Sequence, residues 1–541
     1  DDILSAGEDL ISLQKAALVE QLLLRELFAE RPFAIIRGNA IPNERGAGLL
    51  LHLSSLPSAF GIGDMGPEAR NFADLLERSY QKYWQLLPLH PVEEGQGYSP
   101  YSATSGMAGN TWFISAELLV EDGLLSQEDL EDHFLPQQGI SDYSAAASIK
   151  ATLLAKAWEK FLQQSDIPLH EEWKIFCEKE KYWLNDFACF TILKHLHQSQ
   201  PWYEWPDHFR LRDEQALLQL QNEHDDHFRK IQWEQFLFAR QWHALKTYCN
   251  QKGISLIGDI PFYVSYDSAD VWANREIFKL DEKGRRKGVA GVPPDAFSSD
   301  GQLWGMPVFR WDVLKRSGYQ WWIDRLKKNF ELFDMVRLDH FRAFSAYWEV
   351  SAREETARNG KWIKGPGAQF FKAMKEHFGE LPLIAEDLGE IDAPVYQLRD
   401  KFLFPGMKVL QFAFGEDVGT SPHSPHNHGV HYLVYTGTHD NNTTRGWWRQ
   451  DGSASRHYLE QYLGRAVSED EVPDALCRMA YASVARVAIL PVQDVLGLDQ
   501  VARMNQPAAG AGNWMWRLLP GQINEETERK LKHWTALYNR R

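Results

Sequence analysis

Three short apolar runs in this sequence are each followed, within a few residues, by a carboxylate. They are 335–338 before Asp339, 383–385 before Glu386, and 433–437 before Asp440. A short apolar run bounded by polar or turn residues is typical of a buried strand. In a barrel of parallel strands the carboxyl ends share one rim, so these acidic groups would meet in one pocket. We therefore start from the hypothesis that the chain forms such a barrel.

Five further apolar runs bring the number of predicted strands to eight. These runs are 48–53, 83–87, 255–259, 407–412 and 487–491. Segments with helical periodicity separate them, for example 67–80, and strands that alternate with helices favour a parallel sheet. The predicted fold class is α/β, a (β/α)8 TIM barrel with helical and loop insertions.

The spacing of the predicted strands leaves room for two insertions. Residues 111–251 are too long for one crossover helix and predict a helical insertion, with helices at 148–163, 179–197 and 225–251. Residues 263–311 show little periodicity, and a long irregular segment of this kind is often functional, so we expect an active-site flap.

The remaining segments define the predicted domains. Residues 45–541 are expected to form one catalytic barrel, and residues 1–44 a helical extension with a helix over 10–28. After residue 516 only a single helix fits, at 524–538, so we predict no C-terminal β-sandwich domain.

Arg337 and Asp339 lie two positions apart on a predicted strand, so their side chains share a face. A guanidinium beside a carboxylate lowers the pKa of the carboxylate and keeps it ionised. An ionised Asp at the mouth of a barrel can act as a nucleophile. A purely structural Arg–Asp pair explains the same pattern, and the two residues alone do not decide between these readings.

Three carboxylates in one pocket suit the chemistry of glycosidic bonds. One attacks the anomeric carbon, a second protonates the departing oxygen, and a third stabilises positive charge in the transition state. A retaining enzyme would hold the first two about 5–5.5 Å apart.

The charge and composition limit the classes of partner. The net charge is -16, from 58 basic and 74 acidic residues, which argues against a nucleic acid or an anionic membrane as partner. Neutral sugars are indifferent to this charge. Aromatic residues make up 13% of the chain, and flat rings can stack on sugars, although most such rings pack in a core.

Other features bear on compartment. The four cysteines form no Cys-x-x-Cys pair, which predicts reduced thiols in a reducing compartment. No run approaches the ~18 apolar residues of a membrane span. The chain begins at Asp1 with no recognisable leader, so we expect a cytoplasmic protein, or a plastid protein if a transit segment has been removed.

Four histidines, His423, His426, His428 and His431, raise the alternative of a metal site. No cysteine or carboxylate accompanies them within the loop, and their spacing is not that of a metal-binding helix. We therefore expect neither a metal nor any other cofactor. A metal-dependent hydrolase remains an alternative that a chelator would test.

Several motifs, in order along the chain, resemble those of one known family. They are Gly258-Asp259-Ile260-Pro261, Gly291-Val292-Pro293-Pro294-Asp295, Gly301-Gln302-Leu303-Trp304-Gly305, Val336-Arg337-Leu338-Asp339-His340, Ile384-Ala385-Glu386-Asp387-Leu388-Gly389, Thr438-His439-Asp440-Asn441 and Arg503-Met504-Asn505. The sequence resembles the amylomaltases of glycoside hydrolase family 77, which are 4-α-glucanotransferases related to the α-amylases. The resemblance spans residues 45–517.

The resemblance implies roles for individual residues. Asp339 would be the nucleophile, Glu386 the general acid and base, and Asp440 the transition-state stabiliser. Substrate-binding residues would be Ser99, Tyr101, Asp259, Asp295, Gln302, Trp304, Arg337, His340, His439 and Asn505, with orientation of Arg337 as an alternative role for Asp259. The implied reaction is disproportionation by retaining double displacement, moving α-1,4-glucan segments between malto-oligosaccharides or glucans derived from starch or glycogen, with glucose as an acceptor.

Two other functions stay open at this stage. An α-1,4-glucan hydrolase of the α-amylase type would use the same carboxylates. A glucan-binding scaffold without catalysis would leave turnover unaffected by Asp339→Asn, although the presence of all three carboxylates counts against it.

Overall fold

The computed structural model describes residues 7–9, 14–16, 36–38, 45–164, 168–294, 299–450, 452–507, 509 and 511–541. The chain divides into two compact units, Asp1–Arg45 and Gly46–Arg541. We describe each unit by itself.

The described part of the first unit is a small antiparallel sheet. Strand β1 (Gly7–Asp9) lies between β2 (Gln14–Ala16) and β3 (Ile36–Gly38). A helix over 10–28 was expected, and this prediction is wrong at β2; the rest of that segment lies outside the described residues. Helix propensity is a weak preference, and here the backbone of β2 pairs with β1 instead.

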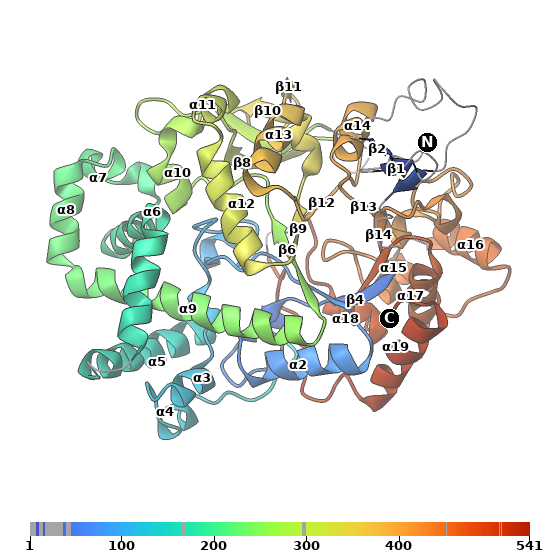
Figure 1. Ribbon diagram of the computed structural model, residues 1–541, viewed down its shortest axis with the longest axis horizontal. Helices are drawn as coiled ribbons and strands as arrows, with labels where there is room; N and C mark the ends of the chain where they lie inside the picture. The colour runs from blue at the N-terminus through green and yellow to red at the C-terminus, as the bar shows by residue number, and fades with distance from the viewer. Residues whose placement is uncertain are drawn as a thin grey trace. The chain divides into compact units, whose positions relative to one another are not determined.

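The second unit is built around an eight-stranded parallel barrel, as predicted (Figure 1). Its strands are β4 (Gly46–Leu50), β5 (Tyr83–Gln85), β6 (Ser255–Ile260), β9 (Met335–Leu338), β12 (Leu383–Ala385), β13 (Gly406–Val409), β14 (Tyr432–Tyr435) and β15 (Val487–Pro491). Neighbours pair in the order β12-β9-β6-β5-β4-β15-β14-β13. The ends of this series meet where the backbone N–H of Ala385 donates to the carbonyl of Pro405 (2.9 Å), which completes the ring.

Helices connect the strands. The following α-helices lie around the barrel: α2 (Pro67–Arg78), α9 (Asp225–Gln251), α12 (Gln320–Leu332), α13 (Gly367–Phe378), α14 (Ala393–Lys401), α15 (Thr444–Gln450), α16 (Gly452–Leu463), α17 (Val472–Ala482), α18 (Val492–Val495) and α19 (Glu525–Leu537). The predicted bounds of α9 match the observed ones. Helix α19 begins where the side chain of Asn524 accepts a hydrogen bond from Thr527 N, close to the predicted start of this helix.

In the described part of the predicted helical insertion, six α-helices precede α9. They are α3 (Ala116–Glu121), α4 (Glu128–Glu131), α5 (Tyr143–Gln163), α6 (Leu169–Leu196), α7 (Asp207–Arg210) and α8 (Glu214–Glu223). Helices α5 to α8 gather at the left of the view in Figure 1, where α6 lies next to the short helix α10 (Ala269–Ala273). The long helices α6 and α9 pack against each other, so the insertion joins the layer of helices outside the barrel.

Residues 263–311 contain more regular structure than their weak periodicity predicts. Besides α10 they form strands β7 (Gly288–Val292) and β8 (Gln302–Pro307). These strands join β10 (Ala346–Ser351) and β11 (Lys361–Lys364) in an antiparallel sheet of order β11-β10-β7-β8. Strand β7 pairs with β8, the next strand along the chain, but its other partner, β10, lies more than 50 residues away, and such distant pairing leaves no local sequence signal.

The interior of the second unit accounts for most of the aromatic residues. Seven tryptophans are almost completely buried: Trp84, Trp202, Trp205, Trp233, Trp242, Trp272 and Trp322. Their burial means that the aromatic content reflects packing more than ligand binding. Among the described residues, no helix is both long enough and apolar enough to cross a bilayer.

Candidate active site

Arg337 is the centre of the polar cluster at the carboxyl end of the barrel. Its Nη1 donates to both carboxylate oxygens of Asp259 (2.8 and 2.7 Å) and to Oδ1 of Asp339 (3.0 Å). The parallel register between β6 and β9 places Asp259 opposite Arg337. Strand pairing therefore sets the geometry of the two ion pairs.

The pKa of Asp339 is higher than the ion pair with Arg337 alone would make it. Burial raises the pKa to about 6, Arg337 opposes this rise, and the charges of Asp259 and Asp440 add to it. The expectation that Arg337 would hold the pKa low is wrong for the net shift, because burial outweighs the effect of Arg337 and the charge of Asp259 opposes that effect. About 30% of the Asp339 side chain is exposed, so the carboxylate remains open to a ligand.

Glu386 follows β12 and is held by two backbone donors. The N–H groups of His340 and Leu388 each donate to one of its oxygens at 2.9 Å. Burial raises its pKa to about 7, and the charge of Asp339 adds to the rise against the opposing effects of Arg337 and Leu388 N. Asp339 therefore contacts a cation, whereas Glu386 contacts neutral backbone donors, and carboxyl groups in such different environments are suited to different roles.

Asp440 is fixed from three sides. Its Oδ1 accepts from the Asn505 amide (2.6 Å), its Oδ2 lies 3.3 Å from His439 Nε2, and its backbone carbonyl accepts from Arg503 (2.8 Å). Burial alone would raise the pKa of Asp440, but His439 and Asn505 hold that pKa far below the usual range. Asp440 is therefore a permanent anion at neutral pH.

Tyr101 links the two halves of this cluster. Its hydroxyl donates to Asp259 Oδ2 (2.7 Å) and lies 2.8 Å from His439 Nε2, and its ring stacks on the ring of His439 at 5.2 Å. The Tyr101 hydroxyl has one proton, and it donates this proton to Asp259. The hydrogen between Tyr101 and His439 therefore belongs to Nε2 of His439, which is directed at the Tyr101 hydroxyl oxygen and at Asp440. Ser99 supports this arrangement by accepting a hydrogen bond from Tyr101 N (3.3 Å).

Asp259 does not have the position of a sugar-binding residue. Its side chain is 0% exposed, and Arg337 and Tyr101 occupy its oxygens. A fully buried carboxylate cannot contact a ligand in the cleft, so direct sugar binding by Asp259 is corrected here. The alternative, orientation of Arg337, is the one that the contacts support.

The sheet formed by β7, β8, β10 and β11 brings Trp304 to the cluster. The Trp304 ring meets the ring of His340 edge to face at 4.9 Å, and its Nε1 donates to Gln302 (3.1 Å). His340 has a left-handed backbone conformation (φ 53°), and burial lowers the pKa of its imidazole to about 3, so the ring is neutral. The predicted binding residue Asp295 lies outside the described residues.

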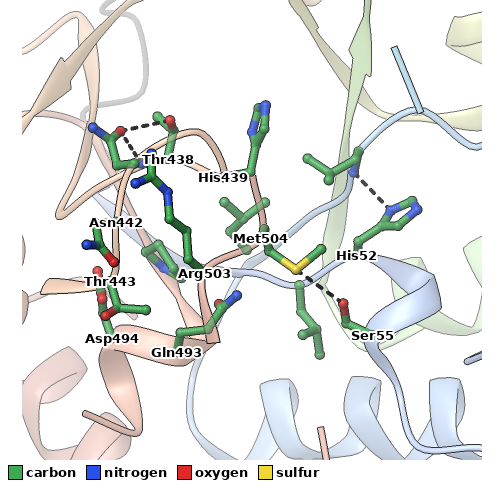
Figure 2. Close-up of a pocket in the computed structure, with 15 residues that line it drawn as sticks. His52, Ser55, Thr438, His439, Asn442, Thr443, Gln493, Asp494, Arg503 and Met504 are labelled. Atoms are coloured by element: carbon green, nitrogen blue, oxygen red, sulfur yellow. Dashed lines mark hydrogen bonds between the residues drawn. The ribbon is translucent and has the colours of Figure 1, made fainter. Parts of the chain in front are cut away.

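A small cavity of about 30 Å³ lies beside His439, between the carboxyl ends of β4, β14 and β15 (Figure 2). Figure 2 shows the His439 ring directed away from Gln493 and Asp494, with Arg503 and Met504 between them. This space holds about two water molecules.

Two residues of the cluster were not among the predicted site residues. Arg503 lies in a motif that resembles the family, but its contact with the Asp440 backbone was not foreseen. The Trp514 ring lies 5.8 Å from Tyr101 and 6.1 Å from His439, with a left-handed backbone (φ 66°). The preceding Gly512-Asn513 was a turn signal, but only the fold brings Trp514 to strands far away in sequence.

The four histidines of the 423–431 loop make separate contacts. His423 accepts from Val409 N (3.2 Å), His428 contacts Ser483 Oγ (2.7 Å), His426 contacts the carbonyl of Gly419, and His431 contacts the carbonyl of Leu403. Over the described ranges, no group of three or more His, Cys, Asp or Glu side chains is arranged to hold a metal ion.

Comparisons with known proteins agree with this arrangement. A family model described as 4-alpha-glucanotransferase, that of glycoside hydrolase family 77, matches residues 51–522. A 4-alpha-glucanotransferase of Thermus thermophilus is 46% identical over 494 residues, which cover 90% of this chain and 97% of the relative. The chloroplastic/amyloplastic 4-alpha-glucanotransferase of Solanum tuberosum is 42% identical over 507 residues, covering 92% and 87%.

A solved structure extends the likeness to three dimensions. The amylomaltase from Streptococcus agalactiae, in complex with acarbose, superposes with a TM-score of 0.88 at 38% identity. The likeness covers 92% of this chain and 100% of that one. The chain therefore belongs to the family of 4-alpha-glucanotransferases.

Proposed function

We propose that Asp339 is the nucleophile and Glu386 the general acid and base of glucan transfer by this chain. The observation that carries the proposal is the difference between the contacts of the two carboxyl groups. The guanidinium of Arg337 donates to Asp339, which favours its charged form, whereas Glu386 accepts from two backbone N–H groups and burial raises its pKa. Near neutral pH the first is mainly charged and the second keeps its proton for a substantial fraction of the time.

The proposed reaction is a double displacement. A carboxylate oxygen of Asp339 bonds to the anomeric carbon of an α-1,4-linked glucose unit, and the bond from that carbon to the bridging oxygen breaks. Glu386 gives its proton to the bridging oxygen, which leaves as the 4-hydroxyl of the shortened glucan. The remaining segment stays on Asp339 as a glycosyl ester.

The second half runs in reverse with a new acceptor. The 4-hydroxyl of an incoming sugar attacks the anomeric carbon, gives its proton to Glu386, and releases Asp339 as a carboxylate. Two inversions retain the α configuration. This sequence requires the carboxyl groups of Asp339 and Glu386 to lie about 5–5.5 Å apart, a separation that stays a prediction.

Asp440 and His439 are proposed to stabilise the transition state. Asp440 is anionic and fixed by Asn505, so it can oppose the positive charge that develops on the sugar ring. His439 is held by Asp440 and Tyr101, and we assign it hydrogen bonds to sugar hydroxyls near the reacting carbon. Arg337 fixes Asp339 for attack.

Transfer requires that an acceptor hydroxyl outcompete water. We propose that Trp304 and Gln302 on β8, beside His340, cover the bound sugar together with Asp295 and limit the entry of water. The rival function, α-1,4-glucan hydrolysis, uses the same carboxylates, and the family membership favours transfer.

The substrates and the compartment are also part of the proposal. We infer malto-oligosaccharides and glucans derived from starch or glycogen as donors, with glucose among the acceptors; the support is the family and the acarbose complex of the Streptococcus relative. We infer action in the cytoplasm, or in a plastid as the name of the Solanum relative suggests. A fluorescent fusion to the chain, imaged in its host cell, tests this last point.

The test is incubation with maltotriose followed by separation of the products. We expect glucose and oligomers longer than maltotriose, with a constant number of reducing ends. Asp339→Asn should lower the rate by at least about 10³-fold, because the nucleophile is lost. Asp417→Asn, a change in an exposed loop, is the control and should retain full activity. An increase in reducing ends without longer products would replace transfer by hydrolysis.

A further inference from the structure

A second, larger pocket lies outside the Arg337 cluster. It has a volume of about 280 Å³ and is walled by α6, α10, α12 and α11 (Trp311–Arg316), together with the loop after β5. Figure 1 shows α10 between α6 and α12. The volume is close to the lower end of the range for small-molecule sites, about 300 Å³. None of its lining residues belongs to the proposed catalytic machinery.

The lining combines aromatic rings with hydrogen-bonding groups. Tyr182 and Trp321 contribute rings, and Asp324 and Gln320 contribute polar groups from the first turns of α12. Further carboxylates come from Asp186, Asp270 and Glu276. Among the described residues that line the pocket, none is lysine or arginine. A phosphate or another anion would therefore meet only repulsion.

Much of the negative charge of the pocket is already compensated. Asp186 forms an ion pair with Arg212 (2.6 Å), and Asp270 Oδ2 accepts from the backbone N–H of Gly106 (2.7 Å). Asp324 has no ion-pair partner in the described part of the chain; its Oδ1 accepts from Gln320 (2.9 Å), and its Oδ2 has no such donor. Because the free carboxylate oxygens are hydrogen-bond acceptors, the ligand that suits these groups is a donor of hydrogen bonds, and a neutral polyol is such a donor.

The pocket also offers hydrogen-bond donors and an exposed aromatic ring to a ligand. Neither the hydroxyl of Tyr182 nor Nε1 of Trp321 has a hydrogen-bond partner within the described ranges, so both can donate to a ligand. Tyr182 is 41% exposed, which leaves its ring open for stacking. A glucose unit has a flat apolar face surrounded by hydroxyl groups. Such a molecule can stack on the aromatic ring of the pocket, accept hydrogen bonds from its donors and donate to its carboxylate.

We propose that this pocket is a second carbohydrate site, which binds a segment of α-glucan through Tyr182, Trp321 and Asp324 while another segment occupies the catalytic cleft. The proposal depends on the proposed function for the identity of the ligand. The first turns of α12 lie on the side of the barrel where strands end, because α12 runs back toward the start of β9. One long glucan could therefore reach both sites.

The experiment uses the full chain with Asp339→Asn, so that binding is measured without turnover. Titration with maltoheptaose in a calorimeter should give two sites per chain. Adding Tyr182→Ala and Asp324→Ala should remove one of them, or weaken it at least about tenfold. Ile175→Ala, an exposed position on the same helix that does not line the pocket, should leave both sites. Unchanged melting temperatures establish that the variants are folded.

The conservative variant Asp324→Asn distinguishes a sugar from a cation. It keeps an acceptor and removes the charge, so maltoheptaose should bind within about twofold of the parent, whereas a polyamine such as spermidine would lose its site. A single site in the parent, a second site that survives the double change, or spermidine binding that competes with maltoheptaose would each overturn the proposal.

Activity measurements separate this proposal from the proposed function. In the chain with Asp339 intact, Tyr182→Ala with Asp324→Ala should leave kcat on maltotriose unchanged and raise KM for long amylose at least about threefold. Absence of transfer in the unaltered chain would refute the proposed function, while the calorimetric result would still decide whether the pocket binds glucan. If the double variant loses the calorimetric site but keeps the KM for amylose, the pocket binds glucan without helping the enzyme to bind its long substrate. That result would overturn the proposal that one glucan occupies both sites at once.

Discussion

At the scale of single residues, the paired carboxyls predict how activity depends on pH. The nucleophile must be ionised, so kcat/KM should rise as the pH increases through about 6, the pKa of Asp339. The acid must be protonated, so kcat/KM should fall as the pH increases beyond about 7, the pKa of Glu386. Because the two groups interact, the limbs describe the pair. Initial rates on maltotriose between pH 4.5 and 9 give the profile, and a flat profile above pH 7 would contradict the role of Glu386.

Tyr101 offers a second prediction at this scale. Tyr101→Phe removes the hydroxyl that joins Asp259 to His439, while Arg337 still holds both oxygens of Asp259. We expect kcat on maltotriose to fall about 10–100-fold, since His439 loses one of its two fixed partners, with little change in melting temperature.

The matched control for this change is Tyr98→Phe in the same loop. The Tyr98 ring stacks on Tyr143 at 4.5 Å and makes no contact with the catalytic carboxylates. It should keep nearly full activity. Equal losses in the two variants would show that the loop, and not the Tyr101 hydroxyl, is what matters.

Part of this site can be predicted from the sequence, and part of it cannot. The strand ends at Asp339, Glu386 and Asp440 follow from local patterns, because an apolar run that stops at a carboxylate needs no knowledge of distant residues. The net pKa shift of Asp339 does not follow, since it depends on how deeply the carboxyl is buried and on how Arg337 is shared with Asp259. Trp514 was missed because only the folded chain brings it to Tyr101.

At the scale of elements, the weakest junction of the barrel lies between β12 and β13. These two strands stand at opposite ends of the paired series, and the side chain of Asp387 bridges them. Its oxygens accept from Met407 N (2.7 Å) and from Arg399 on α14 (2.5 Å). A Cβ at Gly406 would come within 2.5 Å of Asp387, which explains the glycine there.

We predict that Asp387→Ala destabilises the protein by about 2–4 kcal/mol, because Nη1 of Arg399 and the backbone N–H of Met407 both lose their buried acceptor, while Asp400 still binds the rest of the guanidinium. Asp400→Ala is the control; Asp400 pairs with the same arginine, but 62% of its side chain is exposed, so its loss should cost at most about 1 kcal/mol. Urea unfolding followed by tryptophan fluorescence measures both. Similar midpoints for the two variants would show that the bridge contributes little.

Elements with a strong local period were predictable, and those made by distant pairing were not. The bounds of α9 and β15 match the predictions because each has a long or strongly apolar pattern. The antiparallel sheet of β7, β8, β10 and β11 was missed because β7 finds its partner β10 only after β9 has been placed. Strand β2 was missed for another reason: the composition of its segment favours a helix, yet its backbone pairs with the nearby strand β1.

At the scale of the whole second unit, Arg540 ties its two ends together. This guanidinium is 0% exposed and donates to the carbonyls of Gly46 (3.0 Å), Tyr481 (2.7 Å), Ser483 (2.8 Å) and Ala485 (3.0 Å). It therefore satisfies backbone groups next to both the first and the last strand of the barrel.

Arg540→Met should destabilise the unit by about 3 kcal/mol or more, because several buried carbonyls lose their donor together. Arg540→Lys should recover only part of the loss, since an ammonium cannot reach the same spread of acceptors. Arg541→Ala, at an exposed neighbour, is the control and should have little effect. Thermal melts at one protein concentration suffice, and equal melting temperatures for the Arg540 and Arg541 variants would refute the prediction.

The pairing of β4 with β15 has a consequence for synthesis in the cell. A ribosome makes β4 early, yet its neighbour emerges more than 400 residues afterwards, and Arg540 later still. Throughout that interval one edge of a strongly apolar strand has no partner from its own barrel. A nascent chain of this design must be shielded during translation, and its folding yield should depend on chaperones more than its final stability suggests.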